Sequence, residues 1–419
     1  MLNKTKLIAV YAAIITIAFL VVLYRNYNTQ PSSGRIIIGQ DHPFTVDEAK
    51  NLLSEVNTHQ EAFEWAINSL IVQKADLGPL LWSAYKQPDV VKRLIEAGAN
   101  INTQEGNILH RAAMDGDVDM VTYLLAHGAD VNVTDAGQPL IFSAIMGGEA
   151  VIKLLLKHKM PIDGTGPYGI PALHMASWVS TKNVVELLIN AGAQISGTDK
   201  QGRTALYYTI YTHLGSGPSV PTDNVDIAAF LISRGSKVNM RDPEGEAPLH
   251  TAALWNAPQV TALLLKHHAE VDAKDARGFT PLCMAAVGGS VPTFQLLIDA
   301  GADIKHKINN DATILHLASN PEIARIALEN GMKITAKDNI GRTPLHYAAG
   351  CDESKHSISP HFGGRSPYSV FKNTDIMQFL LDSGADINAR DNSNKTPLDC
   401  AYGWGGAVEF LEKRGAKRG

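Results

Sequence analysis

The feature that most constrains this chain is a sequence pattern that repeats every 33 residues. Turn glycines mark the period, because Gly169 and Gly202 are 33 positions apart and so are Gly245 and Gly278. A fixed period of about 20 to 50 residues is typical of proteins in which similar units stack and bury their apolar faces against their neighbours. The period predicts a stack of units, rather than the two or three globular domains that 419 residues usually form.

The residues between these glycines follow a constant order. A glycine is followed by a Thr-Pro-Leu-His box, a pair of small residues, an apolar stripe ending in Leu-Leu, and a closing Gly-Ala-x-apolar-Asn. The clearest boxes are GRTPLHYAA at 341–349, GFTPLCMAA at 278–286 and APLHTAA at 247–253, and the clearest endings are GANIN at 98–102, GADVN at 128–132 and GADIN at 384–388. This order resembles the ankyrin-repeat family. The resemblance implies an all-α solenoid of about ten helix-turn-helix repeats, a fold that binds other proteins.

Each part of the repeat has a physical role. We expect Thr280 and Thr343 to cap the first helix of a repeat, and the proline after each to occupy the first helical position, where its missing N–H costs nothing. Glycines such as Gly128 should end the second helix in a left-handed conformation. The histidine of the box, as in His250 and His346, is used in this family to hydrogen-bond the neighbouring turn.

An apolar segment precedes the repeats. Residues 7–24 (LIAVYAAIITIAFLVVLY) contain no charge, and 18 helical residues at about 1.5 Å each nearly span a bilayer core of about 30 Å. Lys4 and Lys6 precede this segment, so the positive-inside rule predicts that residues 1–6 are cytoplasmic. The sequence thus predicts a single-pass protein of the inner or plasma membrane whose repeats face the periplasm or the exterior. A cleavable signal peptide is the alternative, and whether residues 1–24 are removed stays open.

The rest of the chain divides by composition and rhythm. We expect a polar linker at 25–40, a helical cap at 41–73 and the ankyrin domain at 74–417. Two insertions interrupt the period, at about 211–224 and 351–373, and both fall between the first and second helices of their repeats. Insertions within repeats become loops, which are often on the binding face.

Candidate contact residues lie at the positions that follow the box histidine and the small pair, which point to the inner groove in ankyrin repeats. Aromatic residues, methionine and arginine are enriched in protein interfaces. The candidates in this groove are Arg111, Met175, Trp178, Tyr208, Tyr211, Trp255, Met284 and Tyr347. The alternative for each is that it packs between adjacent first helices.

The longer insertion supplies a second candidate surface. It combines the aromatic residues Phe362, Tyr368 and Phe371 with Arg365, a composition typical of partner-contact loops. The alternative is an excursion without a role, since surface loops tolerate insertions.

Catalytic and metal-binding patterns are absent from the sequence. The box histidines are structural, and His267 and His268 have no cysteine or carboxylate at ligand spacing. We therefore expect no enzyme activity, no cofactor and no metal. A formal charge of −5 also gives no basic field for nucleic acid. Of the three cysteines, Cys283 should be a buried apolar residue, whereas a bridge between Cys351 and Cys400 stays open.

The sequence thus favours a membrane-anchored module that binds a protein partner through the groove and the insertion loops. Resemblance to exported bacterial ankyrin proteins implies a sharper alternative, a periplasmic immunity protein that neutralises a secreted type VI toxin such as a phospholipase. A host-directed ankyrin effector is a further alternative, as is an enzyme hidden in the insertions.

Overall fold

The computed structural model describes residues 47, 50, 67–70, 76–104, 106–166, 169–210, 224–351, 374–401 and 405–419. The chain divides into two compact units. The first unit contains residues 27–200, and the described residues of the second unit run from 201 to 419. Each unit is described by itself.

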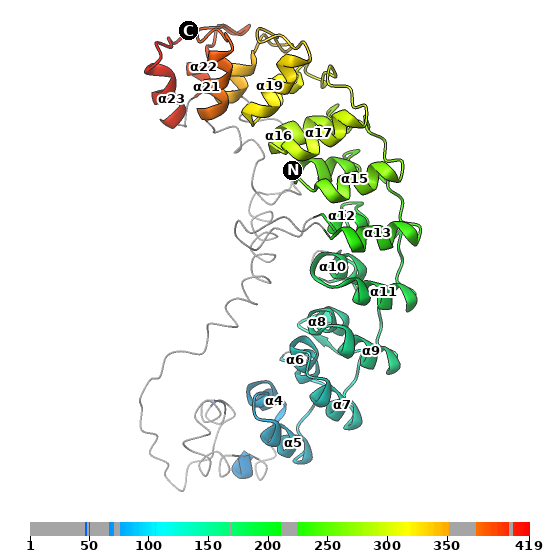
Figure 1. Cartoon of the computed structure of the whole chain (residues 1–419). Coiled ribbons are helices and arrows are strands. Elements are labelled where there is room, and N and C mark those ends of the chain that lie inside the picture. The colour runs from blue at the N-terminus through cyan, green and yellow to red at the C-terminus, as the bar shows by residue number, and fades with distance from the viewer. Residues whose placement is uncertain are drawn as a thin grey trace. The chain divides into compact units, whose positions relative to one another are not determined.

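From residue 76 onward, the described part of the first unit contains four helix pairs in two layers. The first helices of the pairs form one layer and the second helices form the other (Figure 1). The pairs are α4 (Gly78–Ala84) with α5 (Pro88–Glu96), α6 (Ile108–Asp115) with α7 (Val118–Ala126), α8 (Leu140–Gly147) with α9 (Glu149–Lys157), and α10 (Ala172–Val179) with α11 (Lys182–Asn190). A short antiparallel hairpin of β1 (Thr134–Asp135) and β2 (Gln138–Pro139) leads into α8, an addition to the expected all-helical fold.

The second unit continues the same plan. Its first helices pack on one another in chain order, and so do its second helices. The pairs are α12 (Ala205–Tyr208) with α13 (Val225–Ser233), α14 (Pro248–Leu254) with α15 (Pro258–Lys266), α16 (Pro281–Gly288) with α17 (Val291–Asp299), α18 (Ile314–Leu317) with α19 (Pro321–Glu329), α20 (Pro344–Ala348) with α21 (Thr374–Asp382), and α22 (Pro397–Cys400) with α23 (Gly405–Glu412).

The helix boundaries follow from local chemistry. The hydroxyl of Thr280 caps α16 by accepting the N–H of Cys283 at 3.4 Å, as expected. Thr343 begins α20 in a capping box with His346, in which the N–H of Thr343 donates to Nδ1 of His346 at 3.1 Å. Gly128 has a φ of 91°, the left-handed conformation that ends a second helix at no steric cost.

The box histidines join each repeat to the next. Nε2 of His250 lies 3.1 Å from the carbonyl oxygen of Phe279, and Nε2 of His346 lies 3.0 Å from that of Lys395. Because Nδ1 of His250 accepts the N–H of Ala247, the ring proton is on Nε2 and the ring is neutral. Burial lowers the pKa of His250 to about 4, which keeps it neutral near pH 7. The expected structural role of these histidines is confirmed.

Small residues let the first helices approach closely. A Cβ atom at Gly147 would lie 1.8 Å from the carbonyl oxygen of Ala113, and one at Gly288 would lie 2.2 Å from that of Leu254. No side chain fits at these distances, so glycine is required at the carboxyl end of α8 and at that of α16. The same short repeat-to-repeat spacing occurs in both units.

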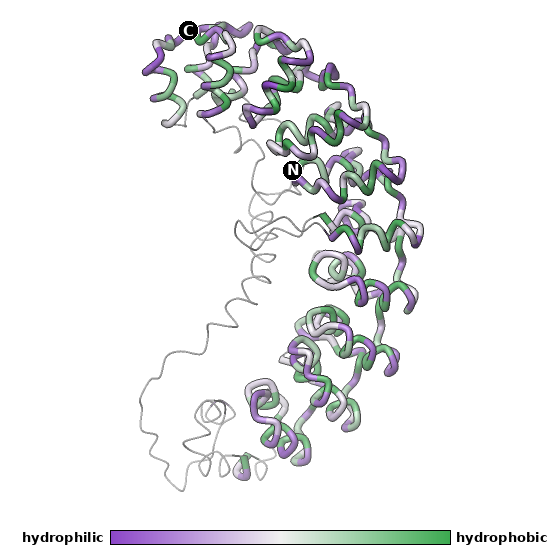
Figure 2. The backbone as a smooth tube through the Cα atoms, viewed as in Figure 1, coloured by the Kyte–Doolittle hydropathy of each residue, from purple (hydrophilic) through white to green (hydrophobic). Residues whose placement is uncertain are grey.

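The expected segments before the repeats fall largely outside the described residues. These include the apolar segment 7–24, the linker 25–40 and most of the cap at 41–73, within which residues 67–70 are helical and both Ile67 and Leu70 are buried. Apolar and hydrophilic residues alternate over short stretches along the described helices (Figure 2). None of the described helices has the length and apolar character needed to cross a membrane.

Candidate protein-binding surface

The first helices of the first unit carry a row of exposed apolar side chains. The row comprises Met114, Met146, Trp178 and Val179, which follow the small pair near the carboxyl ends of α6, α8 and α10. Met146 is 42% exposed and Val179 is 44% exposed, while Met114 and Trp178 are half-buried. Since α6 packs on α8 and α8 packs on α10, these residues lie on adjacent helices. We call this set the apolar row.

Exposed apolar side chains of this size are uncommon among the described residues. Besides Met146 and Val179, the large apolar residue with comparable exposure is Ile340, 43% exposed at a hairpin tip of the second unit. Isolated apolar residues on a surface need no explanation, whereas a row of neighbouring ones is typical of an interaction site. Methionine also adapts its shape to a partner.

Arg111 was expected to face the groove, and the structure places it differently. Its guanidinium lies 5.1 Å from the ring centre of Trp82 and 5.1 Å from that of Tyr85, and its Nε lies 3.3 Å from Oδ2 of Asp115. The residue is buried between the two rings. Burial lowers the pKa of Arg111, and desolvation together with Asp115 and Asp117 raises that of Tyr85. Arg111 therefore joins two repeats and offers little surface to a partner.

Four further groove candidates are also buried. Met175, Tyr208, Met284 and Tyr347 all occupy the position after the box histidine, and all pack where adjacent first helices meet. The hydroxyl of Tyr347 donates to Oδ2 of Asp338 at 3.0 Å and accepts from Nδ2 of Asn310 at 2.8 Å. The expectation that these side chains line an open groove is wrong, because the spacing between first helices leaves this position enclosed.

Two groove candidates keep partial exposure. Trp178 belongs to the apolar row, and Trp255 follows α14 in the second unit and is half-buried. The remaining candidates, Tyr211, Phe362, Arg365, Tyr368 and Phe371, lie outside the described residues, as do both insertions except their edges.

Three members of the apolar row were not predicted from the sequence. Met114, Met146 and Val179 were not singled out, although Met114 and Met146 occupy the same position after the small pair as Trp178. Aligning that position across repeats would have revealed these two methionines. Their degree of exposure, however, depends on how neighbouring repeats pack.

The three cysteines differ in bonding, since two form a disulfide and one is free. Cys351, which follows α20, and Cys400 of α22 form a disulfide, with Cα atoms 4.5 Å apart and a sequence separation of 49. Cys283 is free and fully buried, and burial raises the pKa of its thiol to about 11, so it is an unreactive core residue as expected. The pairing that the sequence left open is therefore decided by the structure.

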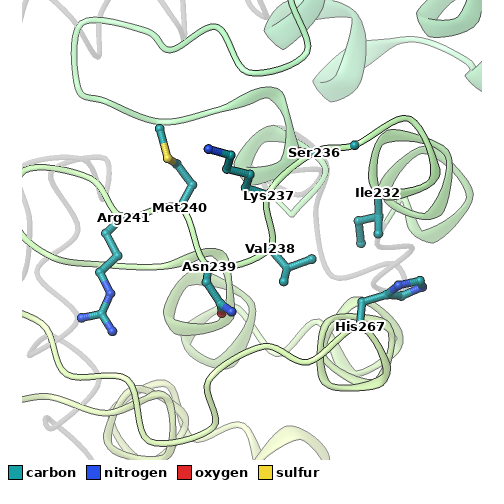
Figure 3. Close-up of a pocket in the computed structure, with 9 residues that line it drawn as sticks. Ile232, Ser236, Lys237, Val238, Asn239, Met240, Arg241 and His267 are labelled. Atoms are coloured by element: carbon teal, nitrogen blue, oxygen red, sulfur yellow. The ribbon is translucent and has the colours of Figure 1, made fainter.

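A pocket of about 530 Å³ lies elsewhere, where α13 and α15 end. Figure 3 shows Val238 pointing toward Ile232 and His267. The polar lining of this pocket is already hydrogen-bonded within the fold. The side chain of Asn239 donates to the carbonyl oxygen of His268 and accepts the N–H of Glu270. Within the described residues, no group of three or more His, Cys, Asp or Glu side chains is placed to hold a metal ion.

Two layers of paired helices, joined by histidines and closed by turn glycines, define a helical repeat scaffold of the kind that presents surfaces to other proteins. The family description "Ankyrin repeats (3 copies)" matches residues 56–135, 109–199, 219–308 and 295–357, and "Ankyrin repeat" matches residues 340–392. These matches cover well over half of the chain. The chain belongs to the ankyrin-repeat family.

Three similar proteins match this chain over a limited stretch of residues. The nuclear factor NF-kappa-B p105 subunit of Gallus gallus is 34% identical over 152 residues, which is 35% of this chain and 14% of that protein. Palmitoyltransferase AKR1 of Lachancea kluyveri is 36% identical over 129 residues, or 28% and 18%, and the neurogenic locus notch homolog protein 1 of Xenopus tropicalis is 27% identical over 171 residues, or 39% and 6%. The chain thus spans less than a fifth of the length of these relatives.

Proposed function

We propose that this protein is a membrane-anchored, non-enzymatic scaffold that binds a protein partner through the apolar row of its first unit. The observation that carries the proposal is the exposure of Met146 and Val179 on adjacent first helices. Ankyrin repeats are protein-interaction modules, and an exposed apolar row gives a partner apolar surface to bury, which supplies most of the free energy of association.

The disulfide supports a location outside the reducing cytosol. Disulfides persist mainly in oxidising compartments, and Cys351–Cys400 joins two repeats of the second unit. This agrees with the orientation proposed for residues 7–24, with residues 1–6 in the cytoplasm and the repeats in the periplasm or at the cell exterior. In that compartment a secreted toxin, such as a phospholipase delivered by type VI secretion, is the partner we favour.

Affinity capture from the membrane fraction tests the binding surface. The intact protein is compared with Met146→Ser/Val179→Ser and with the control Ile340→Ser, which removes an equally exposed apolar side chain from the second unit. We expect the double variant to lose binding by about tenfold or more, and the control to bind as the unmodified protein does. Equal recovery of the same partner by all three would contradict the proposal.

Location and partner need separate tests. A reporter fused to the C-terminus should be active only outside the cytoplasm, and activity only in the cytoplasm would overturn the proposed orientation. Production of the protein with an envelope-directed phospholipase toxin should restore growth, and the double variant should not. If both proteins restored growth equally, toxin neutralisation would not depend on the apolar row.

A further inference from the structure

One hairpin of the second unit carries a charge reversal. The residue that follows the turn is basic in three hairpins of this unit, where it is Arg203, Arg342 or Lys395. In hairpin 242–246 the residue at this position is the acid Glu246. Glu246 is almost fully buried. A buried carboxylate is costly unless it is paired, so its surroundings decide its protonation.

The partner of Glu246 comes from the next hairpin. Oε1 of Glu246 lies 2.8 Å from Nη2 of Arg277, and Nε of Arg277 donates to Oδ2 of Asp275 at 2.8 Å. The same guanidinium lies 5.0 Å from the ring centre of Phe279. One cation is thus shared by two carboxylates that are both shielded from solvent, and the contact joins hairpin 242–246 to hairpin 275–279.

Other groups around this joint add negative charge. Asp242 is buried, and its Oδ1 accepts the N–H of Glu246 at 2.8 Å. The charge of Glu244 acts on both Asp242 and Glu246, and that of Arg203 acts on Asp242. Three buried carboxylates, those of Asp242, Glu246 and Asp275, thus gather around the guanidinium of Arg277, which pairs with two of them.

The groups on the helices packed against the joint do not supply the missing positive charge. His250 of α14 is neutral, since it donates to the carbonyl oxygen of Phe279 and accepts the N–H of Ala247. Arg241 is engaged with Glu270 and with the carbonyl oxygen of Lys274. The hydroxyl of Tyr207 donates to the carbonyl oxygens of Met240 and Glu246 and carries no charge. The excess of buried negative charge is therefore relieved most directly by a proton.

We propose that the joint between hairpins 242–246 and 275–279 is a proton-sensitive contact, which tightens when Glu246 takes up a proton and loosens when it loses one. This goes beyond partner binding, because it makes the local stability of the second unit depend on the pH around it. The apolar row belongs to the other unit, so failure of either proposal leaves the other intact.

The sign of the effect follows from the pKa values. Burial, the largest cause, raises the pKa of Glu246 from its ordinary 4.5 to about 7 and that of Asp242 from 3.8 to about 6. A carboxyl whose pKa is higher in the folded chain than in the unfolded chain stabilises the fold when protonated. This contribution is complete below about pH 4.5 and is lost as the pH rises through about 7.

The buried histidines act in the opposite direction. Burial lowers the pKa values of His250 and His316 to about 4, so their contribution is lost as the pH falls from 6.5 toward 4. The total pH profile of the unit mixes the two effects. A local measurement and a comparison of variants isolate Glu246.

Hydrogen exchange of the full-length protein, corrected for intrinsic rates, tests the proposal at the amides of Ala276 and Phe279. The amide of Ala276 donates to the carbonyl oxygen of Glu244 in the other hairpin and reports opening of the joint, and the amide of Phe279 donates to Oδ1 of Asp275 and reports opening of the hairpin that holds Arg277. Protection at pH 5.5 should exceed protection at pH 8 on the order of tenfold. The reference is the contact of Arg342 with Asp391, where the residue after the turn is basic. Its exchange is measured at the amides of Arg342 and Lys395.

The variant Glu246→Gln keeps the shape of the side chain and removes the titratable carboxyl group at this position. It should reduce the tenfold difference at Ala276 and Phe279 to the smaller part that Asp242 contributes, and it should leave the reference joint unchanged. The proposal is overturned if the variant keeps the difference. It is also overturned if, in the unmodified protein, both joints change equally with pH, a result that does not depend on the variant folding.

Discussion

The same position of the repeat is surface in one unit and core in the other. Directly after the small pair, the first unit has Met146, which is 42% exposed, and Trp178, which is half-buried. In the second unit, Leu254 is 8% exposed and Val287 is fully buried. All four side chains are apolar, so residue type does not explain the difference.

The length of the following repeat explains the burial of Val287. Helix α18 ends at Leu317, and α19 begins at Pro321, which leaves a short turn. That turn bonds to the end of α16, since the N–H and the hydroxyl of Ser319 donate to the carbonyl oxygen of Ala286 at 3.1 and 3.0 Å. A repeat about three residues short of the 33-residue period therefore closes over its neighbour. In the first unit, the turn between α10 and α11, which belongs to the repeat after α8, leaves Met146 exposed.

The largest difference between the units should come from the disulfide. Replacing Cys351 and Cys400 by serine should lower the free energy of unfolding of the second unit by about 4 kcal/mol, because the bridge closes a 49-residue loop. Denaturant unfolding followed by hydrogen exchange assigns the loss to a unit. Reductant should affect the unmodified protein and leave the double variant unchanged. A loss spread equally over both units would remove this contrast.

Serine at Val287 tests whether this position is core. The change should destabilise the second unit by about 2 to 3 kcal/mol, because a buried isopropyl group is lost and a hydroxyl is buried in its place. Chemical denaturation provides the measurement, and Val287→Ala separates the loss of packing from the burial of the hydroxyl. If Val287→Ser cost as little as serine at Met146, the two positions would not differ.

Phenylalanine at Tyr347 tests a groove candidate that the structure places in the core. The change removes the hydroxyl that donates to Asp338 and accepts from Asn310, and should cost about 1 to 2 kcal/mol. Partner binding should be unaffected. Weaker binding at unchanged stability would return Tyr347 to the contact surface.

Serine at Met146 should have the smallest effect on folding. An exposed side chain outside any polar network changes the free energy of unfolding by less than about 0.5 kcal/mol. Thermal unfolding measures this change. A loss of 2 kcal/mol or more would show that Met146 supports the fold, and the apolar row would then lose its meaning as a free surface.

The sequence by itself determined the repeating fold. The 33-residue spacing of turn glycines, the histidine boxes and the closing glycines predicted paired helices, and the structure has them. The burial of Cys283 and the bonds of His346 to its own turn and to the next hairpin also followed from the pattern. These features are local or recur in each repeat, so periodicity records them directly.

Only the tertiary structure decided which candidate residues are available to a partner. Arg111 is enclosed by Trp82 and Tyr85 of the preceding repeat, and Val287 is covered by a turn of the following one. The pairing of Cys351 with Cys400 likewise depends on how two helices pack. Exposure and pairing are set by contacts between repeats, and a pattern read along one chain carries the type of each residue but not the distance to its neighbour.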